Sequence, residues 1–227
     1  MKKLLIFGDR VYAEIVYEYF TFDSEYEVAA FVVDKEYIEK SEFCGLPVVG
    51  FEDIEEKYPP ENFEMHIAIV YGDMNRLRES KYKLAKQKGY KLATYVSSQA
   101  FVWRNVEIGE NCFIFENNTI QPSVTIGDGV ILWSGNHIAH HTSVGDFSFI
   151  TSHVVLAGFC KVGSHSFLGG NVCMRDQISV GDFCWVGHGA VLNNDLKDHS
   201  IVRAEGSNIK PLNEKVLRRY LGGRSMG

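Results

Sequence analysis

The chain has 227 residues, 45% of them hydrophobic, and a formal net charge of −6 at pH 7. This length is enough for two modest domains, and the acidic balance argues against nucleic acid as a partner. No segment approaches the roughly 18 apolar residues that span a membrane, and the apolar start is too short for a signal peptide. The five cysteines show no CxxC spacing, which indicates neither a disulfide framework nor a zinc cluster and favours the reducing cytoplasm.

The first part of the chain alternates between short apolar runs and segments with helical spacing. Residues 11–20 place apolar side chains at helical intervals, and residues 75–88 are rich in Lys and Arg and are followed by Gly89. Strands are predicted at 3–7, 28–33, 66–70 and 92–96, with a short extended piece at 46–49. This alternation predicts a small parallel, Rossmann-like sheet, an α/β domain that covers residues 1–97.

The next part of the chain, residues 98–202, is dominated by a six-residue period. Every sixth residue from Val102 to Leu192 is aliphatic or Met, and glycines recur every eighteen residues from Gly109 to Gly181. Such self-similarity is typical of a β-helix, in which each six-residue unit forms one short strand and one corner. Three units per repeat predict a triangular prism whose coils stack about 4.8 Å apart. The period ends at Asp198, and residues 203–227 are predicted to form a tail with a short helix from Pro211.

The segment from Trp133 to Gly145 holds three of the eight histidines, His137, His140 and His141. Alternation along a strand predicts His140 and His141 on opposite sides, with His137 at a corner. A neutral imidazole is a suitable base near pH 7. The alternative is a metal site, as in a zinc-dependent β-helix of the carbonic anhydrase type. Because no carboxylate or cysteine joins the cluster at ligand spacing, we expect no metal.

The repeat resembles that of the hexapeptide-repeat acyltransferases, which fold as left-handed parallel β-helices, although general connection rules favour the right hand. Residues 140–145, His-His-Thr-Ser-Val-Gly, resemble a segment of the nucleotide-sugar acetyltransferases related to sialic-acid O-acetyltransferases and amino-sugar N-acetyltransferases. Many of these enzymes carry a small Rossmann-like N-terminal domain. The resemblance implies that His140 is the general base and that His141 stands where an orienting acid is common. Phe149 replaces a second histidine of some relatives, for which His153 is a possible substitute.

The resemblance also implies an acyl donor, most simply acetyl-CoA, and a homotrimer with sites between neighbouring β-helices. Outward glycines let an extended thiol arm lie against strand backbone. The residues expected to hold this donor are Ala157, Gly158, Gly170, Gly187 and His188. We expect the Gly158 N–H to stabilise the oxyanion.

The nucleotide-linked sugar is expected at the turn after the first strand and near the histidines. Its predicted contacts are Gly8, Asp9, Arg10, Asp34, Asn136 and His137. The turn does not make GxGxxG, so a dinucleotide site is not expected. Trp133 is predicted to contact another subunit or to stack on a sugar.

The predicted reaction is transfer of an acetyl group from acetyl-CoA to the amine of a nucleotide-linked deoxysugar, by direct attack in a ternary complex. Two alternatives stay open at this point. One is O-acetylation of a sugar hydroxyl, which the sequence does not distinguish from attack by an amine. The other is a catalytically inactive β-helix that acts as a scaffold or binding module.

Overall fold

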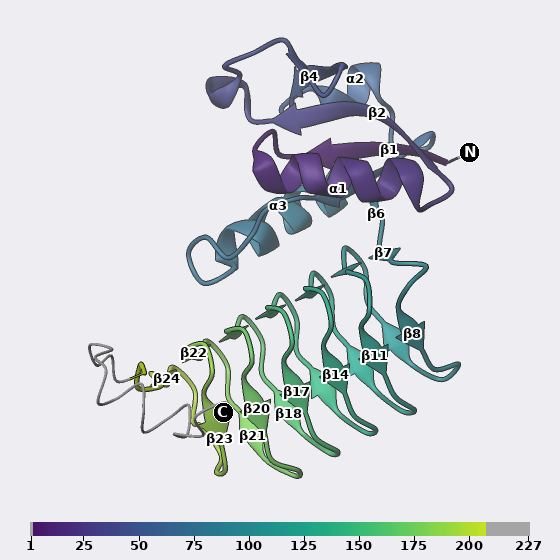
Figure 1. Ribbon diagram of the computed structural model, residues 1–227. Helices are drawn as coiled ribbons and strands as arrows, with labels where there is room; N and C mark the ends of the chain where they lie inside the picture. The colour runs from purple at the N-terminus through teal and green to yellow at the C-terminus, as the bar shows by residue number, and fades with distance from the viewer. Residues whose placement is uncertain (1, 208–227) are drawn as a thin grey trace, which may run out of the picture.

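The computed structural model describes residues 2–207, which form an N-terminal α/β unit above a β-helix (Figure 1). The predicted tail helix from Pro211 lies outside the described residues. The N-terminal elements are β1 (Lys2–Phe7), α1 (Val11–Phe22), β2 (Tyr26–Val33), a 3₁₀ turn (Lys35–Tyr37), β3 (Glu42–Phe43), β4 (Leu46–Gly50), α2 (Ile54–Lys57), β5 (Phe63–Ile67), α3 (Arg76–Gln87) and β6 (Lys91–Leu92).

The N-terminal sheet has the strand order β3-β4-β2-β1-β5-β6. Its strands are parallel except at the edge, where β3 and β4 form an antiparallel hairpin that the sequence analysis did not predict. The strand predicted at 92–96 is wrong as a single element. It is divided between β6, at the edge of this sheet, and β7, which pairs with β10 in the β-helix.

The β-helix is built from two-residue strands, as its six-residue period requires. They are β7 (Tyr95–Val96), β8 (Phe101–Val102), β9 (Glu107–Ile108), β10 (Phe113–Ile114), β11 (Thr119–Ile120), β12 (Thr125–Ile126), β13 (Ile131–Leu132), β14 (His137–Ile138), β15 (Ser143–Val144), β16 (Phe149–Ile150), β17 (Val155–Leu156), β18 (Lys161–Val162), β19 (Phe167–Leu168), β20 (Cys173–Met174), β21 (Ser179–Val180), β22 (Trp185–Val186), β23 (Val191–Leu192) and β24 (Ile201–Val202). Every third strand joins the same parallel sheet. The result is a triangular prism with three faces, as predicted.

The outward residues, which come first in each strand, give the three faces different characters. The sheet of β7, β10, β13, β16, β19, β22 and β24 carries mostly aromatic rings and is called the aromatic face. The sheet from β8 to β23 carries a mixture of apolar and polar residues and is called the mixed face. The sheet of β9, β12, β15, β18 and β21, the polar face, presents mostly polar and charged residues.

The second residue of each strand points inward, and the aliphatic series from Val102 to Leu192 fills the core. Cys112, Cys160 and Cys184 are buried with it, as expected for small core residues. The corners between faces are tight two-residue turns. From Asn111 to Gly189 the second residue of each corner is left-handed, with φ between 53 and 77°.

Three corner columns follow from this arrangement. The histidine corner, between the mixed and polar faces, contains residues 104–105, 122–123, 140–141, 158–159 and 176–177. The α3 corner, between the polar and aromatic faces, contains residues 110–111, 128–129, 146–147, 164–165 and 182–183. The cleft corner, between the aromatic and mixed faces, contains residues 116–117, 134–135, 152–153, 170–171 and 188–189.

The N-terminal unit packs on the aromatic face through α1 and the sheet. Tyr19 meets Phe113 and Phe115 edge to face, with ring centroids 5.9 and 5.1 Å apart, and Tyr95 stacks on Phe113 at 4.6 Å. These rings belong to one buried cluster that includes residues of both parts of the chain. Apolar burial of this extent joins the two units.

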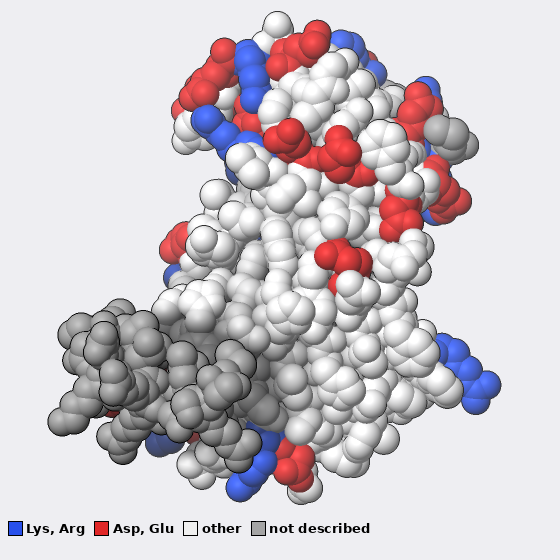
Figure 2. All heavy atoms as spheres, viewed as in Figure 1, with Lys and Arg blue, Asp and Glu red and all other residues white. Residues whose placement is uncertain are grey.

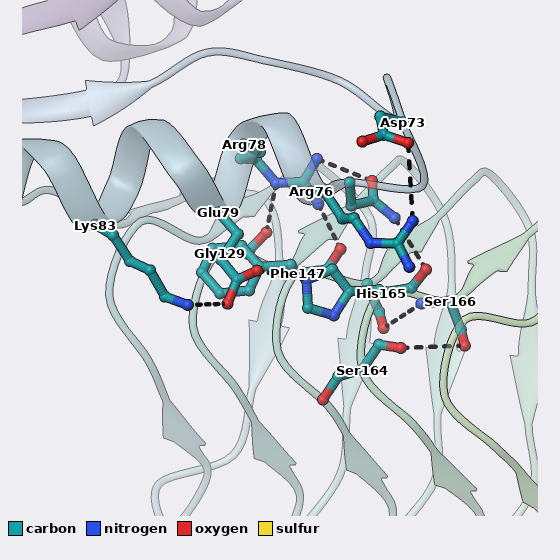
Figure 3. A network of polar contacts seen from close by, with 12 residues as sticks. Asp73, Arg76, Arg78, Glu79, Lys83, Gly129, Phe147, Ser164, His165 and Ser166 are labelled. Atoms are coloured by element: carbon teal, nitrogen blue, oxygen red, sulfur yellow. Dashed lines mark hydrogen bonds and ion pairs between the residues drawn. The ribbon is translucent and has the colours of Figure 1, made fainter. Parts of the chain in front are cut away.

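The N-terminal unit makes a second contact with the β-helix at the α3 corner, through a buried arginine (Figure 3). Arg78 on α3 is fully buried and donates to the carbonyls of Gly129 at 2.9 Å and Phe147 at 2.7 Å. It also donates to the carbonyls of Ile69 and Val70, each at 3.1 Å, in the loop after β5. Burial lowers the pKa of Arg78 to about 10, so the guanidinium stays charged at neutral pH. One side chain therefore links α3, this loop and two coils.

Candidate active site

A cleft of about 720 Å³ lies between the N-terminal unit and the aromatic face. Its β-helix side is formed by Trp133, Phe149 and Phe167, together with residues of the cleft corner. Tyr71, in the loop that Arg78 holds, packs edge-on against Phe149 and Phe167 with centroids 5.4 Å away in each case. A cleft with aromatic walls and a few polar groups is the usual form of a small-molecule site.

The turn after β1 forms the upper edge of the cleft, where the sequence predicted substrate contacts. Gly8 has φ 129°, and a Cβ there would lie 2.9 Å from the carbonyl oxygen of Ala68, so the turn requires glycine. Asp9 is 6% exposed, and its Oδ2 makes no hydrogen bond to another described residue. The nearest cations to the Asp9 carboxylate are Arg10 at 3.7 Å and Lys40 at 3.8 Å. Gly8, Asp9 and Arg10 all line the cleft.

Asp34 lies beside this turn but is already engaged. Both of its carboxylate oxygens accept hydrogen bonds from Lys81, at 2.7 and 2.6 Å. The pair lines a second hollow of about 420 Å³, which shares Asp9, Arg10 and Ile69 with the cleft. The structure therefore places Asp34 next to the predicted site but in an ion pair, which argues against direct recognition of a ribose.

His140 and His141 occupy a corner, because the corner turn interrupts the strand alternation assumed from the sequence. The predicted corner residue, His137, instead lies in β14 and points outward on the mixed face. Nδ1 of His140 lies 3.2 Å from Nδ1 of His141, and Nε2 of His140 makes no hydrogen bond to any other described residue. A base needs one such unoccupied nitrogen, and His140 has it.

Gly158 lies directly beside the His140 ring, one coil further along. A Cβ on Gly158 would lie 2.7 Å from Cε1 of His140, so this position leaves room for the ring only as glycine. Phe159 completes the corner: it stacks on His141 at 4.8 Å and meets His140 edge to face at 5.2 Å. The histidine corner is thus a small packed cluster on an otherwise exposed edge.

The residues predicted to hold the acyl donor are divided between two corners. Ala157 and Gly158 lie at the histidine corner, whereas Gly170, Gly187 and His188 lie at or beside the cleft corner. Nδ1 of His188 accepts a hydrogen bond from the N–H of Gly170 at 2.8 Å. Because a backbone N–H can only donate, the hydrogen of a neutral His188 must be on Nε2. His188 lines the cleft as such a donor.

One expectation about a neighbouring residue does not agree with the structure. Asn136 is 1% exposed, and its amide bonds the carbonyl of Trp133 and the N–H of Val154, so it cannot contact a substrate. His153 lies at the cleft corner, on a different edge of its own chain from His140, and its role as a substitute histidine stays a prediction. Trp133 lines the cleft and packs against Tyr12 of α1, with ring centroids 5.9 Å apart, and its contact with a sugar or another subunit also stays a prediction.

Two functional features were missed by sequence reasoning. Tyr71 and Phe167 wall the cleft, but nothing in their local sequence distinguishes them from ordinary exposed or core aromatics. The signal that could have found Phe167 is the outward series at eighteen-residue spacing, which is aromatic at every position but one: Tyr95, Phe113, Ile131, Phe149, Phe167 and Trp185.

Within residues 2–207 there is no group of three or more His, Cys, Asp or Glu side chains placed to bind a metal ion. Over the same residues, no helix has both the length and the apolar character needed to cross a bilayer.

Comparison with known proteins agrees with this architecture. The family model for the bacterial transferase hexapeptide (six repeats) matches residues 105–140. No curated protein sequence matches the chain significantly. Among solved structures, the acetyltransferase domain of PglB from Neisseria gonorrhoeae FA1090 is 25% identical, with a TM-score of 0.77 over 88% of this chain and 96% of that one.

The chain folds as a left-handed parallel β-helix with an N-terminal α/β unit. PerB from Caulobacter crescentus, solved with CoA and GDP-perosamine, is 26% identical, with a TM-score of 0.77 over 88% of this chain and 93% of that one. WeeI from Acinetobacter baumannii AYE, at 18% identity and a TM-score of 0.62, shares the fold. The predicted left-handed hexapeptide-repeat fold, and its resemblance to sugar acetyltransferases with a Rossmann-like N-terminal unit, are confirmed.

Proposed function

We propose that this protein is an acetyl-CoA-dependent N-acetyltransferase that acts on a nucleotide-linked amino sugar. The observation that carries the proposal is the likeness over 88% of the chain to a perosamine N-acetyltransferase solved with CoA and GDP-perosamine. That likeness includes both the N-terminal unit and the β-helix, which here enclose an aromatic cleft and carry a histidine with an unoccupied nitrogen.

The complete site requires a second copy of the chain. The cleft lies on the aromatic face, and the histidine corner joins the other two faces, so the two features are on opposite sides of one prism. A single chain therefore cannot bring His140 to a sugar in its own cleft. Packing the histidine corner of one copy against the cleft corner of the next unites them, and closed cyclic symmetry makes three such sites in a trimer.

The mixed face supplies the surface for this association. Its outward residues Phe101, Val155 and Val191 are 53%, 40% and 67% exposed. In Figure 2 charged side chains gather over the N-terminal unit, whereas the coils that face the viewer are almost free of them. Exposed apolar patches of this kind mark interaction sites. The polar face, with Glu107 and Lys161 among its outward residues, does not offer such a surface.

The nucleotide sugar fits the N-terminal side of the site. The two connected hollows run from the Asp34–Lys81 pair, past the Gly8–Arg10 turn, to the aromatic cleft. We place the nucleotide at the carboxyl ends of the parallel strands, where ligands bind in open α/β sheets, and the sugar against the rings of the cleft. The Nε2–H of His188 donates to an oxygen of the sugar or the diphosphate.

The reaction itself needs one base and one oxyanion donor. The amine nitrogen attacks the thioester carbonyl of acetyl-CoA, a C–N bond forms, and Nε2 of His140 takes the proton that the amine loses. The C–S bond then breaks, and the thiolate takes that proton back from His140 to leave as the CoA thiol. The N–H of Gly158 donates to no other described residue and is free to stabilise the oxyanion, a contribution of about 3 kcal/mol in comparable sites. All five cysteines are free, in keeping with a cytoplasmic location, which stays a prediction.

The test is release of CoA thiol from acetyl-CoA in the presence of nucleotide-linked amino sugars and their hydroxyl counterparts. Thiol release with the amines, and formation of the amide, supports the proposal. Release with the hydroxyl sugars alone overturns it in favour of O-acetylation. Tight binding of nucleotide sugars without any thiol release overturns it in favour of a binding module.

A further inference from the structure

A groove of about 450 Å³ opens where the second half of α1 meets the first coils of the β-helix. Glu18 lines it from α1 and Glu116 lines it from the cleft corner, while Phe22, which is 77% exposed, adds an aromatic ring. A third acid, Asp23, already accepts hydrogen bonds from residues 95–98. In Figure 2 acidic side chains lie at this junction of the N-terminal unit and the coils. No Lys or Arg of the described chain lines the groove, so it offers carboxylates and a ring without a cation.

The carboxylates of Glu18 and Glu116 are free to meet a cation from outside. Neither forms an ion pair within residues 2–207. Burial favours the neutral form of Glu116, but hydrogen bonds from the hydroxyls of Ser134 and Tyr19 hold its pKa below the ordinary value. Glu116 is therefore charged at neutral pH, and its charge is not balanced within the described chain.

The cation that this groove lacks is present at the histidine corner. Arg104 is exposed and forms no ion pair with another described residue. It is the only Lys or Arg in that column, and Glu116 is the only Asp or Glu in the column of the cleft corner. In the proposed trimer these two corners of neighbouring copies face each other. The arginine of one column thus meets the glutamate of the other.

Closed symmetry brings the two residues to similar levels along the prism. Rotation about an axis parallel to the prism leaves every residue at its own height along that axis. A coil rises about 4.8 Å, so Arg104, two thirds of a coil before Glu116, lies only about 3 Å lower. An arginine side chain spans that difference. The same geometry brings His140 to within about 3 Å of the level of Ser152, which lines the cleft.

We propose that the acidic groove of one copy binds Arg104 of the next copy, and that this ion pair holds the histidine corner of the second copy against the cleft corner of the first. This inference rests on the proposed function, which requires a second copy to complete the site. The planar guanidinium pairs with the carboxylates along its edge, and its face lies on the ring of Phe22. Within the chain, Arg76 already lies over the ring of Phe183, 4.5 Å from its centroid.

Two neutral variants test the ion pair through the stability of the trimer. Arg104→Gln removes the cation, and Glu116→Gln removes the anion while leaving an amide oxygen for the Tyr19 hydroxyl. Each change should raise, on the order of tenfold, the protein concentration at which half of the trimer dissociates. The double variant should dissociate no more readily than either single variant, because both changes remove the same interaction. Sedimentation over a dilution series measures all three.

Lys161→Gln is the matched control. Lys161 is exposed on the polar face, and its replacement changes the charge by the same amount as Arg104→Gln. We expect the trimer of this variant to dissociate as that of the unsubstituted protein does. Added salt should weaken the control and the unsubstituted trimer more than it weakens Arg104→Gln, which has no pair left to screen.

A crosslinking experiment detects the contact between corners while keeping the ion pair. Asn105→Cys and Asn117→Cys, combined in one chain, place thiols beside Arg104 and Glu116 on different corners of the prism. A short bismaleimide should join neighbouring copies into a covalent trimer. Asn171→Cys in place of Asn117→Cys should give no such product, because Asn171 lies three coils, or about 14 Å, further along the cleft corner.

The outcomes separate this inference from the proposed function. Unchanged dissociation of Arg104→Gln, multiplied effects in the double variant, or crosslinking through Asn171→Cys overturns the inference and leaves the proposed function intact. A trimer that weakens as expected but releases no thiol from acetyl-CoA overturns the proposed function and leaves the contact in place. A protein that is monomeric at every concentration overturns both the contact and the shared site.

Discussion

The cleft and the histidine corner are two halves of one proposed site, and they are built differently. The cleft is formed by residues from distant parts of the chain, Tyr71, Phe149 and the turn at Gly8 among them. The histidine corner is formed within two successive coils, by residues 140–141 and 158–159. The cleft has the shape of a binding site but no residue placed as the base. The histidine corner has a base but no cavity. Substitutions in the cleft should therefore impair substrate binding, and substitutions at the histidine corner should impair turnover.

The largest effect is expected from removing the base. His140→Ala should lower kcat at least 100-fold while the KM for the nucleotide sugar changes little, because the cleft residues that bind the sugar are unchanged. Steady-state kinetics with each substrate varied in turn measures both values. Near-normal turnover would remove His140 from the mechanism.

Mixing two inactive variants should restore activity if the halves come from different copies. Ser152→Tyr fills the mouth of the cleft at a corner position where the coil already accepts His188 and Glu116. Co-expression of this variant with His140→Ala leaves about a quarter of the sites with an intact cleft and an intact histidine. Turnover of the mixture near that fraction supports a shared site, and turnover no higher than that of either variant alone contradicts it.

The hydrogen bonds of Arg78, which hold the loop that forms one wall of the cleft, should contribute strongly to the unfolding free energy. Arg78→Met leaves the carbonyls of Gly129 and Phe147 without their charged donor and should cost about 3 kcal/mol of unfolding free energy. Arg78→Lys is the control, because it keeps the charge but not the fork that reaches several carbonyls. Urea unfolding measures both, and recovery of less than half of the loss by Lys is expected.

Lowering the pH should reduce the unfolding free energy through His66, which lies in the N-terminal unit. His66 on β5 is 1% exposed, and burial lowers its pKa to about 4, against the hydrogen bond from Nδ1 to the carbonyl of Ala93, which favours the charged form. The unfolded chain therefore binds a proton below about pH 6.5 that the folded chain does not bind until about pH 4. The unfolding free energy should fall by up to about 3 kcal/mol across that interval. His66→Phe should flatten this part of the stability profile, and an unchanged slope would contradict the assignment.

The smallest effect is expected at the exposed wall of the cleft. Tyr71 is 57% exposed, so Tyr71→Ala should leave stability nearly unchanged. Loss of one aromatic wall should raise the KM for the nucleotide sugar about tenfold, with kcat and the KM for acetyl-CoA unaffected. Tyr71→Phe is the control that keeps the ring. A fall in kcat instead would mean that the cleft also takes part in the chemistry.

The regular part of the fold could be predicted from the sequence almost completely. Each six-residue unit contacts only its neighbours one coil away, so the inward aliphatic series from Val102 to Leu192 is enough to define the prism. The histidines were found for the same reason, because an interruption is visible against a strict repeat. Their place in a corner was not predicted, because a two-residue strand is too short for alternation to persist through the turn.

The sequence by itself therefore determined the β-helix, its apolar interior and the histidines that interrupt its repeat. Only the tertiary structure decided which of those residues could act. It buried Asn136, paired Asp34 with Lys81, and divided the predicted donor-binding residues between two corners. The reason is physical: a local repeat is set by neighbours in the chain, whereas the docking of the N-terminal unit depends on Arg78 and on aromatic rings far apart in sequence, whose partners no local pattern specifies.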